Sequence, residues 1–191
     1  MGLFDALLGR SQPKRPDLDS LFSVPGAALT LRSALGMEPT GTGTVCFRAA
    51  SGPAFARVAE DVRALVGDGA DAPDVVTTQD DFGYTWFEVR GVADDLSGLC
   101  TQLHAVNSTL ESQGFATGLL CTTISFRASD GRPVALVYLY KQGTFYPFAP
   151  VPGVRSRDNV LELQVRDQLS GELVMEKDLQ RWLALWDAPG L

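Results

Sequence analysis

The sequence predicts an α+β fold, in which an antiparallel sheet carries helices packed mainly on one face. Short runs of alternating apolar residues are separated by tight turns containing Gly and Asp, which is typical of antiparallel strands. Longer stretches instead place apolar residues at helical spacing. The 191 residues are 45% hydrophobic and 20% charged, which is the composition of a globular chain rather than a disordered one.

The chain is predicted to open with an amphipathic peptide and a linker, residues 1–16, followed by one α+β domain over residues 17–191. Residues 10–16 contain two prolines and three cations, and this composition favours a linker. Before the linker, four large apolar side chains recur on one helical face. They are Leu3, Phe4, Leu7 and Leu8.

Two helical segments are predicted before the first strand. Asp17 can serve as the N-cap of a short helix that ends before Pro25. Residues 27–37 fit both a helix and an alternating strand, and we favour the helix. Residues 40–43 are expected to form a turn.

Two longer amphipathic helices are predicted further along the chain. The first starts near residue 51 and ends at Gly67. The second spans residues 94–114, with Asp94 or Asp95 as its N-cap and Gly114 as its end. Their apolar residues are spaced as on one helix face. They are Phe55, Val58, Val62 and Leu65 in the first, and Leu96, Leu99, Leu103, Val106 and Leu110 in the second.

Strands are predicted at residues 44–49, 75–78, 84–90, 119–127, 133–141 and 144–148. The fifth is apolar on both faces, so we expect it inside the sheet, whereas Pro147 confines the sixth to an edge or an end. Residues 160–166 alternate as in a further strand. A last helix is expected near residues 177–185.

The charge distribution argues against nucleic acid as a partner. The net charge is −7, and the 16 lysines and arginines are scattered instead of forming the basic stripe that phosphate binding needs. Three widely spaced cysteines are expected to be reduced core residues, which places the chain in the cytoplasm. No apolar run reaches the roughly 18 residues of a membrane span, and no secretion signal is evident.

One constellation suggests catalysis. Cys100, His104, Ser108 and Glu111 share one face of the helix over residues 94–114, so a thiol or hydrolase-type enzyme with Cys100 activated by His104 is an alternative. Side chains along one straight helix splay apart, and no oxyanion loop accompanies them. We therefore predict no catalytic, metal or cofactor site.

Three groups of residues are candidates for partner or membrane contact. Trp182 and Trp186 belong either to an exposed aromatic patch or to the core of the sheet. Arg155 and Arg157 either grip an anionic group or are simply solvated. The apolar face of residues 2–9 either forms a weak membrane anchor or docks on its own domain or on a dimer mate.

Several longer strings carry a family resemblance over nearly the whole chain. The chain resembles the PspA-associated protein PspAB family of actinobacteria in MGLFDALLGR, VCFRAASGPAF, DDFGYTWFEVRG, HAVNSTLESQGF, VYLYKQGTFYPFAP, RDNVLELQ and DLQRWLALWDAPGL. The resemblance implies an envelope-stress, or phage-shock, context and association with PspA, a coiled-coil membrane-stress effector. It supplies no catalytic residues.

These observations favour a non-enzymatic adaptor or regulatory protein that binds a protein partner, PspA or another stress-system component, near the membrane. The thiol enzyme and a peripheral lipid sensor acting through residues 2–9 are the alternatives, and a homo-oligomer is left open. By analogy only, the expected arrangement of sheet and helices is similar to that of secretion chaperones.

Overall fold

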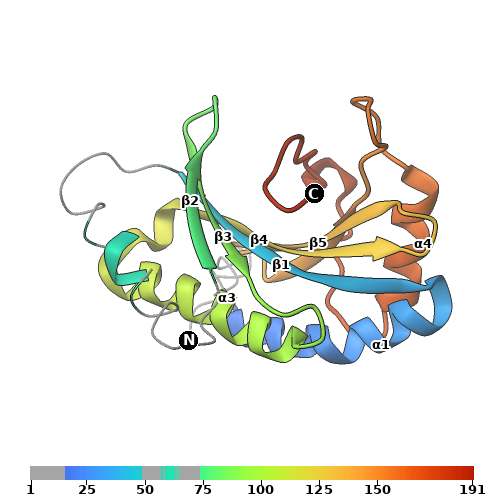
Figure 1. Ribbon diagram of the computed structural model, residues 1–191, viewed down its shortest axis with the longest axis horizontal. Coiled ribbons are helices and arrows are strands. Elements are labelled where there is room, and N and C mark those ends of the chain that lie inside the picture. Colours follow the sequence, from blue (N-terminus) through green and yellow to red (C-terminus); the bar gives the residue numbers. More distant parts are fainter. Residues whose placement is uncertain (1–15, 49–56, 58, 63, 65–73) are drawn as a thin grey trace, which may run out of the picture.

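A computed structural model describes residues 16–48, 57, 59–62, 64 and 74–191 of the chain. Its centre is a six-stranded antiparallel sheet with the order β2-β3-β1-β4-β5-β6, which confirms the α+β prediction (Figure 1). The strands are β1 (Met37–Arg48), β2 (Asp74–Gln79), β3 (Tyr84–Arg90), β4 (Leu119–Ala128), β5 (Pro133–Leu139) and β6 (Thr144–Phe148).

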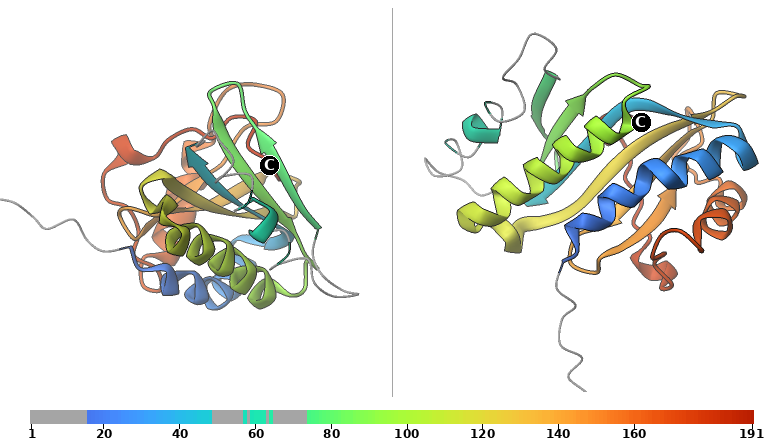
Figure 2. Two further views of the ribbon diagram at one scale, coloured as in Figure 1. Left: turned by 90° about the vertical axis from the view of Figure 1, so that its left-hand side faces the viewer. Right: turned by 90° about the horizontal axis from the view of Figure 1, so that it is seen from below.

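Two helices, α1 (Val24–Leu35) and α3 (Leu96–Leu110), run side by side across one face of this sheet (Figure 2). A third, α4 (Asn159–Leu169), packs against α1 and β6. Shorter helical segments are η1 (Leu18–Ser23), η2 (Glu111–Phe115), η3 (Ala116–Gly118) and η4 (Leu179–Arg181). Helices therefore cover mainly one face, as predicted.

The predicted signals of α3 are confirmed at both ends. The Asp95 carboxylate accepts a hydrogen bond from Gly98 N at 2.8 Å, so Asp95 is the N-cap rather than Asp94. The helix passes into the wider turn η2, which Gly114 closes with φ of 85°. The predicted apolar residues of α3 are all buried. Asn107 ties the helix to the sheet, because its amide donates to Thr122 Oγ1 at 2.9 Å.

The segment between residues 17 and 37 is helical, as favoured, but its boundaries differ from the prediction. Asp17 makes no capping bond through its side chain, and the first turn, η1, continues directly into α1. Pro25 lies in the first turn of α1, where its missing N–H costs nothing, so it does not end the helix. Gly36, with φ of 61°, makes the C-terminal cap of α1.

The turn predicted at residues 40–43 is wrong. These residues belong to β1, which pairs with β4 on both sides of an irregularity between Pro39 and Gly43. Gly41 has φ of 78° and approaches Gly91 and Ala93 so closely that a β-carbon there would overlap their backbone. The glycines that indicate a turn therefore serve a bulge within a long strand.

The strand predicted at residues 160–166 is also wrong, because this segment is α4. Leu161, Val165 and Leu169 recur every four residues and are buried, whereas Leu163, which a strand would turn to the same side as Leu161 and Val165, is 39% exposed. The Asp158 side chain caps the helix through Leu161 N at 3.0 Å. Within a segment of only seven residues, apolar residues spaced two or four apart fit both the period of a strand and that of a helix. The N-cap at Asp158 distinguishes the two.

The last predicted helix, near residues 177–185, is reduced to the single turn η4. The rest of the segment is irregular and lies over the sheet face opposite α1 and α3 (Figure 1). Two of its carbonyls bond to side chains rather than to a following helical turn: Leu183 O accepts from Tyr146 Oη, and Trp182 O accepts from Arg157. Contacts with distant residues therefore override the helical spacing.

Both edge predictions for the last two strands are confirmed. β5 lies between two neighbours and is buried on both faces, and β6, which contains Pro147, is the edge strand. The outer edge of β6 is covered by the chain itself: Phe145 N donates to Val174 O at 2.8 Å, and Glu176 N donates to Phe145 O at 2.7 Å.

Most of the helix predicted from residue 51 to residue 67 lies outside the described residues. Within it, residues 57, 59–62 and 64 are helical, and Ala59 and Val62 are buried in the core under the helical layer. The peptide predicted at residues 2–9 lies outside the described residues as well.

Replacing the N-cap of α3 tests the assignment of its start. We expect Asp95→Ala to lower the free energy of unfolding by about 1 kcal/mol, because Gly98 N–H loses its acceptor. Asp94→Ala is the matched control and should change it by less than about 0.5 kcal/mol. Urea denaturation followed by circular dichroism measures both, and equal losses would show that Asp95 is not the cap.

Candidate functional site

The sheet face opposite α1 and α3 carries an apolar groove of about 540 Å³. Figure 1 shows the β2–β3 hairpin rising beside this face, with the C-terminal segment lying over the strands. The groove is lined by residues from β1, β3, β4, β5, β6 and this segment. They include Cys46, Tyr84, Trp86, Leu120, Cys121, Leu139, Tyr146, Leu183 and Leu185, with Lys141, Gln142, Gln180 and Arg181 among the polar members.

The floor of the groove follows from strand register. Cys46 of β1 lies directly opposite Trp86 of β3 and opposite Cys121 of β4, and Cys121 lies opposite Leu139 of β5. Directly opposed residues of antiparallel strands project to the same face. One row of four side chains thus crosses four strands, and its central pair consists of two thiols.

Of the two central thiols, Cys46 is held in its neutral form. A hydrogen bond with Cys121, together with burial, raises the pKa of the Cys46 thiol far above its ordinary value. Cys46 and Cys121 are only 3% and 6% exposed. A buried, uncharged thiol behaves as a small apolar side chain. The floor therefore favours apolar ligand groups over charged ones.

The hairpin wall is held by Asp80. Its carboxylate accepts hydrogen bonds from Phe82 N at 3.0 Å and Tyr84 N at 2.9 Å, and its other oxygen accepts from Trp86 Nε1 at 3.0 Å. Gly83 closes the turn with φ of 80°, which favours glycine. Asp80 therefore fixes the turn and the Trp86 indole together. The Phe82 side chain at the tip remains 79% exposed.

The opposite wall is the irregular C-terminal segment. Trp182 stacks on Tyr146 with 5.9 Å between ring centroids, and its indole donates to Glu176 O at 3.1 Å. Tyr146 Oη donates to Leu183 O at 3.0 Å. These bonds anchor the wall from below. Leu183 itself points away from the core and is 60% exposed at the rim.

The structure separates the two predicted arginines. Arg155 forms an exposed pair with Asp187 at 2.8 Å. Arg157 is mostly buried, and it bonds Glu162 at 2.9 Å and the Trp182 carbonyl at 2.5 Å. Its guanidinium also lies 5.2 Å from the centre of the Phe148 ring. Arg157 therefore connects α4 to the C-terminal segment.

The predicted tryptophans are mainly core residues. Trp182 is only 6% exposed, and Trp186 packs edge-on against Phe148 at 5.2 Å. The interpretation as a sheet core thus describes them better than the exposed patch does, although the sealing element is irregular instead of helical. Leu3, Phe4, Leu7 and Leu8 lie outside the described residues.

Sequence reasoning missed the residues that form the groove, above all Trp86, Leu120, Leu139 and Leu183. Trp86 and Leu139 belong to strands that were predicted, but the row they share depends on register between β3, β1, β4 and β5. Register across strands distant in sequence leaves no local signal. An exposed leucine in a segment predicted as helix gives no signal either.

The geometry does not support Cys100 as a nucleophile. Cys100 is fully buried under the helical layer, and burial raises the pKa of its thiol to about 12. His104 is engaged elsewhere: Nε2 lies 3.2 Å from Asp19 Oδ1, and Nδ1 lies 3.4 Å from Ser108 Oγ. The Phe22 ring covers the imidazole at 4.8 Å. This histidine connects α3 to η1.

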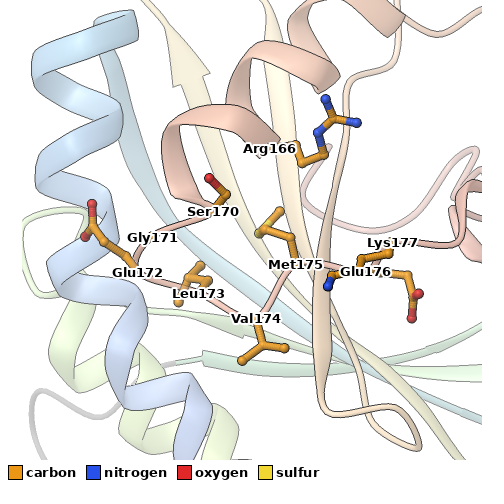
Figure 3. Close-up of a pocket in the computed structure, with 9 residues that line it drawn as sticks. All are labelled: Arg166, Ser170, Gly171, Glu172, Leu173, Val174, Met175, Glu176 and Lys177. Atoms are coloured by element: carbon orange, nitrogen blue, oxygen red, sulfur yellow. The ribbon is translucent and has the colours of Figure 1, made fainter.

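A second hollow, of about 640 Å³, lies beside the end of α4 (Figure 3). It is lined by Arg166 and by one continuous stretch, residues 170–177. Its carboxylates are already used, because Glu172 accepts from Thr30 and Glu176 accepts from Thr144. It is larger than the groove, but it combines fewer elements and has no aromatic lining, so we regard the groove as the site.

Two further findings bear on function. No helix within the described ranges is both long and apolar enough to cross a membrane. Among the same residues, no three His, Cys, Asp or Glu side chains are placed to hold a metal ion together.

Comparison with known proteins gives one match. A family profile described as PspAB, PspA associated protein B, covers residues 1–190 of the chain. Neither the curated proteins nor the solved structures contain a match.

The matched arginines give a first test of this geometry. Arg157→Ala should lower the free energy of unfolding by about 3–5 kcal/mol, because Glu162, 2% exposed, is left without its cation. Arg155→Ala removes an exposed ion pair and should lower the free energy of unfolding by less than about 1 kcal/mol. Urea denaturation measures both. A similar loss in the two variants would contradict the structural role of Arg157.

Thiol reactivity gives a second test. At pH 8 a thiol with a pKa of about 12 is ionised in roughly one molecule in 10,000, so native Cys100 should react very slowly with a disulfide reagent. In denaturant all three thiols should become accessible and react with the reagent. Ellman titration with and without urea, with Cys100→Ser to assign the signal, provides the measurement. Rapid reaction of Cys100 in the folded protein would instead support the hypothesis of a thiol enzyme.

Proposed function

The chain belongs to the PspAB family, PspA associated protein B, and from that membership we propose that it is a non-enzymatic adaptor of an envelope-stress system that binds a protein partner. The proposal includes a cytoplasmic location close to the membrane. The observation that carries it is the apolar groove on the open face of the sheet.

The rims of the groove favour a partner over a small molecule. Leu183, which lines the groove, is 60% exposed, and Phe82, at the tip of the hairpin two residues from the lining residue Tyr84, is 79% exposed. Large apolar side chains exposed around a concave apolar surface are typical of protein-binding sites. The polar residues of the lining include Lys141 and Gln142 of the β5–β6 turn.

The size and lining of the groove suit one face of an amphipathic helix. A cavity of about 540 Å³ accepts a few large side chains and not a whole domain. Helix-in-groove recognition uses apolar anchors that recur every three or four residues. Acidic residues flanking such anchors would meet the Lys141 ammonium.

PspA is the partner that the family description names, and the resemblance describes it as a coiled-coil effector. Helices of coiled coils carry a continuous apolar seam, which is the kind of surface that the groove accepts. We therefore propose a helical segment of PspA as the occupant. The thiol enzyme has no supporting geometry around Cys100, and the lipid sensor rests on residues outside the described part.

Two exposed leucines provide a matched test of the groove. Leu183→Asp places a charge on the groove rim and should weaken binding of purified PspA by about tenfold or more. Leu29→Asp is the control, because Leu29 is 64% exposed but lies on α1, on the other side of the sheet. Calorimetry with the full chain measures both.

The two variants also define the contrary results. Equal weakening by Leu183→Asp and Leu29→Asp would remove the groove from the interface. Absence of any PspA binding to the unmodified chain would remove PspA as the partner. Since both leucines are already solvent-exposed, circular dichroism should show that both variants keep the fold.

A further inference from the structure

We propose that residues 2–9 of the same chain occupy the groove when no partner is bound. This peptide would then compete with the partner for one surface. The competition rests on the proposed function, whereas the occupancy concerns the isolated chain and is tested without a partner. Three observations support the proposal: where the described chain begins, how far residues 10–15 reach, and how the peptide matches the groove.

The described chain begins on the helical side of the sheet, at the β5–β6 turn. Tyr138 Oη donates a hydrogen bond to Asp17 O at 2.7 Å. Asp17 N also faces the β5–β6 turn, because a β-carbon added to Gly143 would lie 3.8 Å from it. Lys141 and Gln142 of the same turn line the groove. Residues 1–15 therefore join the described part of the chain at the β5–β6 turn, whose residues form one end of the groove.

The intervening linker is long enough. Residues 10–15 span up to about 20 Å when extended, at about 3.3 Å per residue. The layers of a sheet structure lie about 10 Å apart, so the linker can pass from the helical side to the open face. If residues 2–9 dock as a helix, they would be about 12 Å long, at 1.5 Å per residue.

The peptide matches the groove in chemistry. Leu3, Phe4, Leu7 and Leu8 form one apolar face at helical spacing. The groove offers apolar side chains of similar kind, Trp86, Leu120, Leu139 and Leu183. Each large side chain that becomes fully buried contributes roughly 1.5–3 kcal/mol, against the cost of ordering a short helix. The balance favours reversible docking.

Charge supports contact of the cationic tail with the acidic body of this chain as a whole, although the charged residues that line the groove itself, Lys141 and Arg181, are cations. Arg10, Lys14 and Arg15 against Asp5 give residues 1–15 a net charge of +2, which leaves −9 on residues 16–191 out of the total of −7. A cationic tail tethered to an acidic body is attracted to it at moderate ionic strength. The same attraction would act between two copies of the chain. Docking within one chain is preferred, because the tether keeps the local concentration of the peptide high.

The occupancy can be measured in the full chain by paramagnetic relaxation. A nitroxide is attached at Gly9→Cys, which is selective because Cys46, Cys100 and Cys121 are buried. We expect loss of signal from the Trp86 indole N–H and from the Leu183 amide. Trp86 is on β3, three strands and about 14 Å from β5, where the chain is tethered. Because the extended linker also reaches this far, the matched variants below separate docking from tether proximity.

Adjacent positions provide the matched variants. Leu7→Asp puts a charge on the apolar face, and Ala6→Asp puts the same charge on the opposite face. We expect Leu7→Asp to restore the Trp86 and Leu183 signals and Ala6→Asp to leave them broadened. Equal broadening in both variants would overturn the proposal. Broadening that appears in an unlabelled copy mixed with a labelled one would overturn docking within the same chain.

Partner affinity then tests the competition. If the peptide fills the groove for one half to nine tenths of the time, Leu7→Asp should tighten PspA binding by about two- to tenfold. Weaker binding of Leu7→Asp would overturn the competition, because the peptide would then be part of the interface. If PspA binds neither form, the proposed function fails, while the relaxation data still decide the occupancy.

Discussion

A sheet that is apolar on both faces must be covered on both, and this constraint determines the architecture of the chain. β5 and β6 are buried throughout except at Thr144, and their side chains point to both sides. Helices α1 and α3 cover one face (Figure 2). On the other face the cover is the irregular C-terminal segment. A cover without regular structure leaves apolar floor between itself and the β2–β3 hairpin, and this floor is the groove.

The irregular cover depends on one buried ion pair. Glu162 of α4 accepts hydrogen bonds from Arg157 and from Ala149 N at 2.9 Å, and Arg157 in turn holds the Trp182 carbonyl. Trp182 then stacks on Tyr146, which is part of the groove lining. A charge pair at the edge of the sheet is thus connected, through two aromatic rings, to the wall of the proposed binding surface.

Local signals predicted local structure well and the site poorly. Asp95 and Gly114 delimit α3 because a cap and a left-handed glycine act on adjacent backbone. The strand predicted at residues 160–166 is wrong, because Leu161 and Val165, four residues apart, fit the period of a strand and that of a helix equally. The groove was not predictable: it requires the register that aligns Trp86, Cys46 and Cys121, and a wall shaped by the distant Arg157.

The covered edge of β6 has a consequence for assembly. An edge strand with free backbone groups is a template on which a strand of another molecule can grow into a continuous intermolecular sheet. Here Val174 O and Glu176 N already occupy the groups of Phe145 that such a strand would use. Pro147 removes one more donor from the same strand. Polymerisation through this edge would first require peeling away the segment that follows α4.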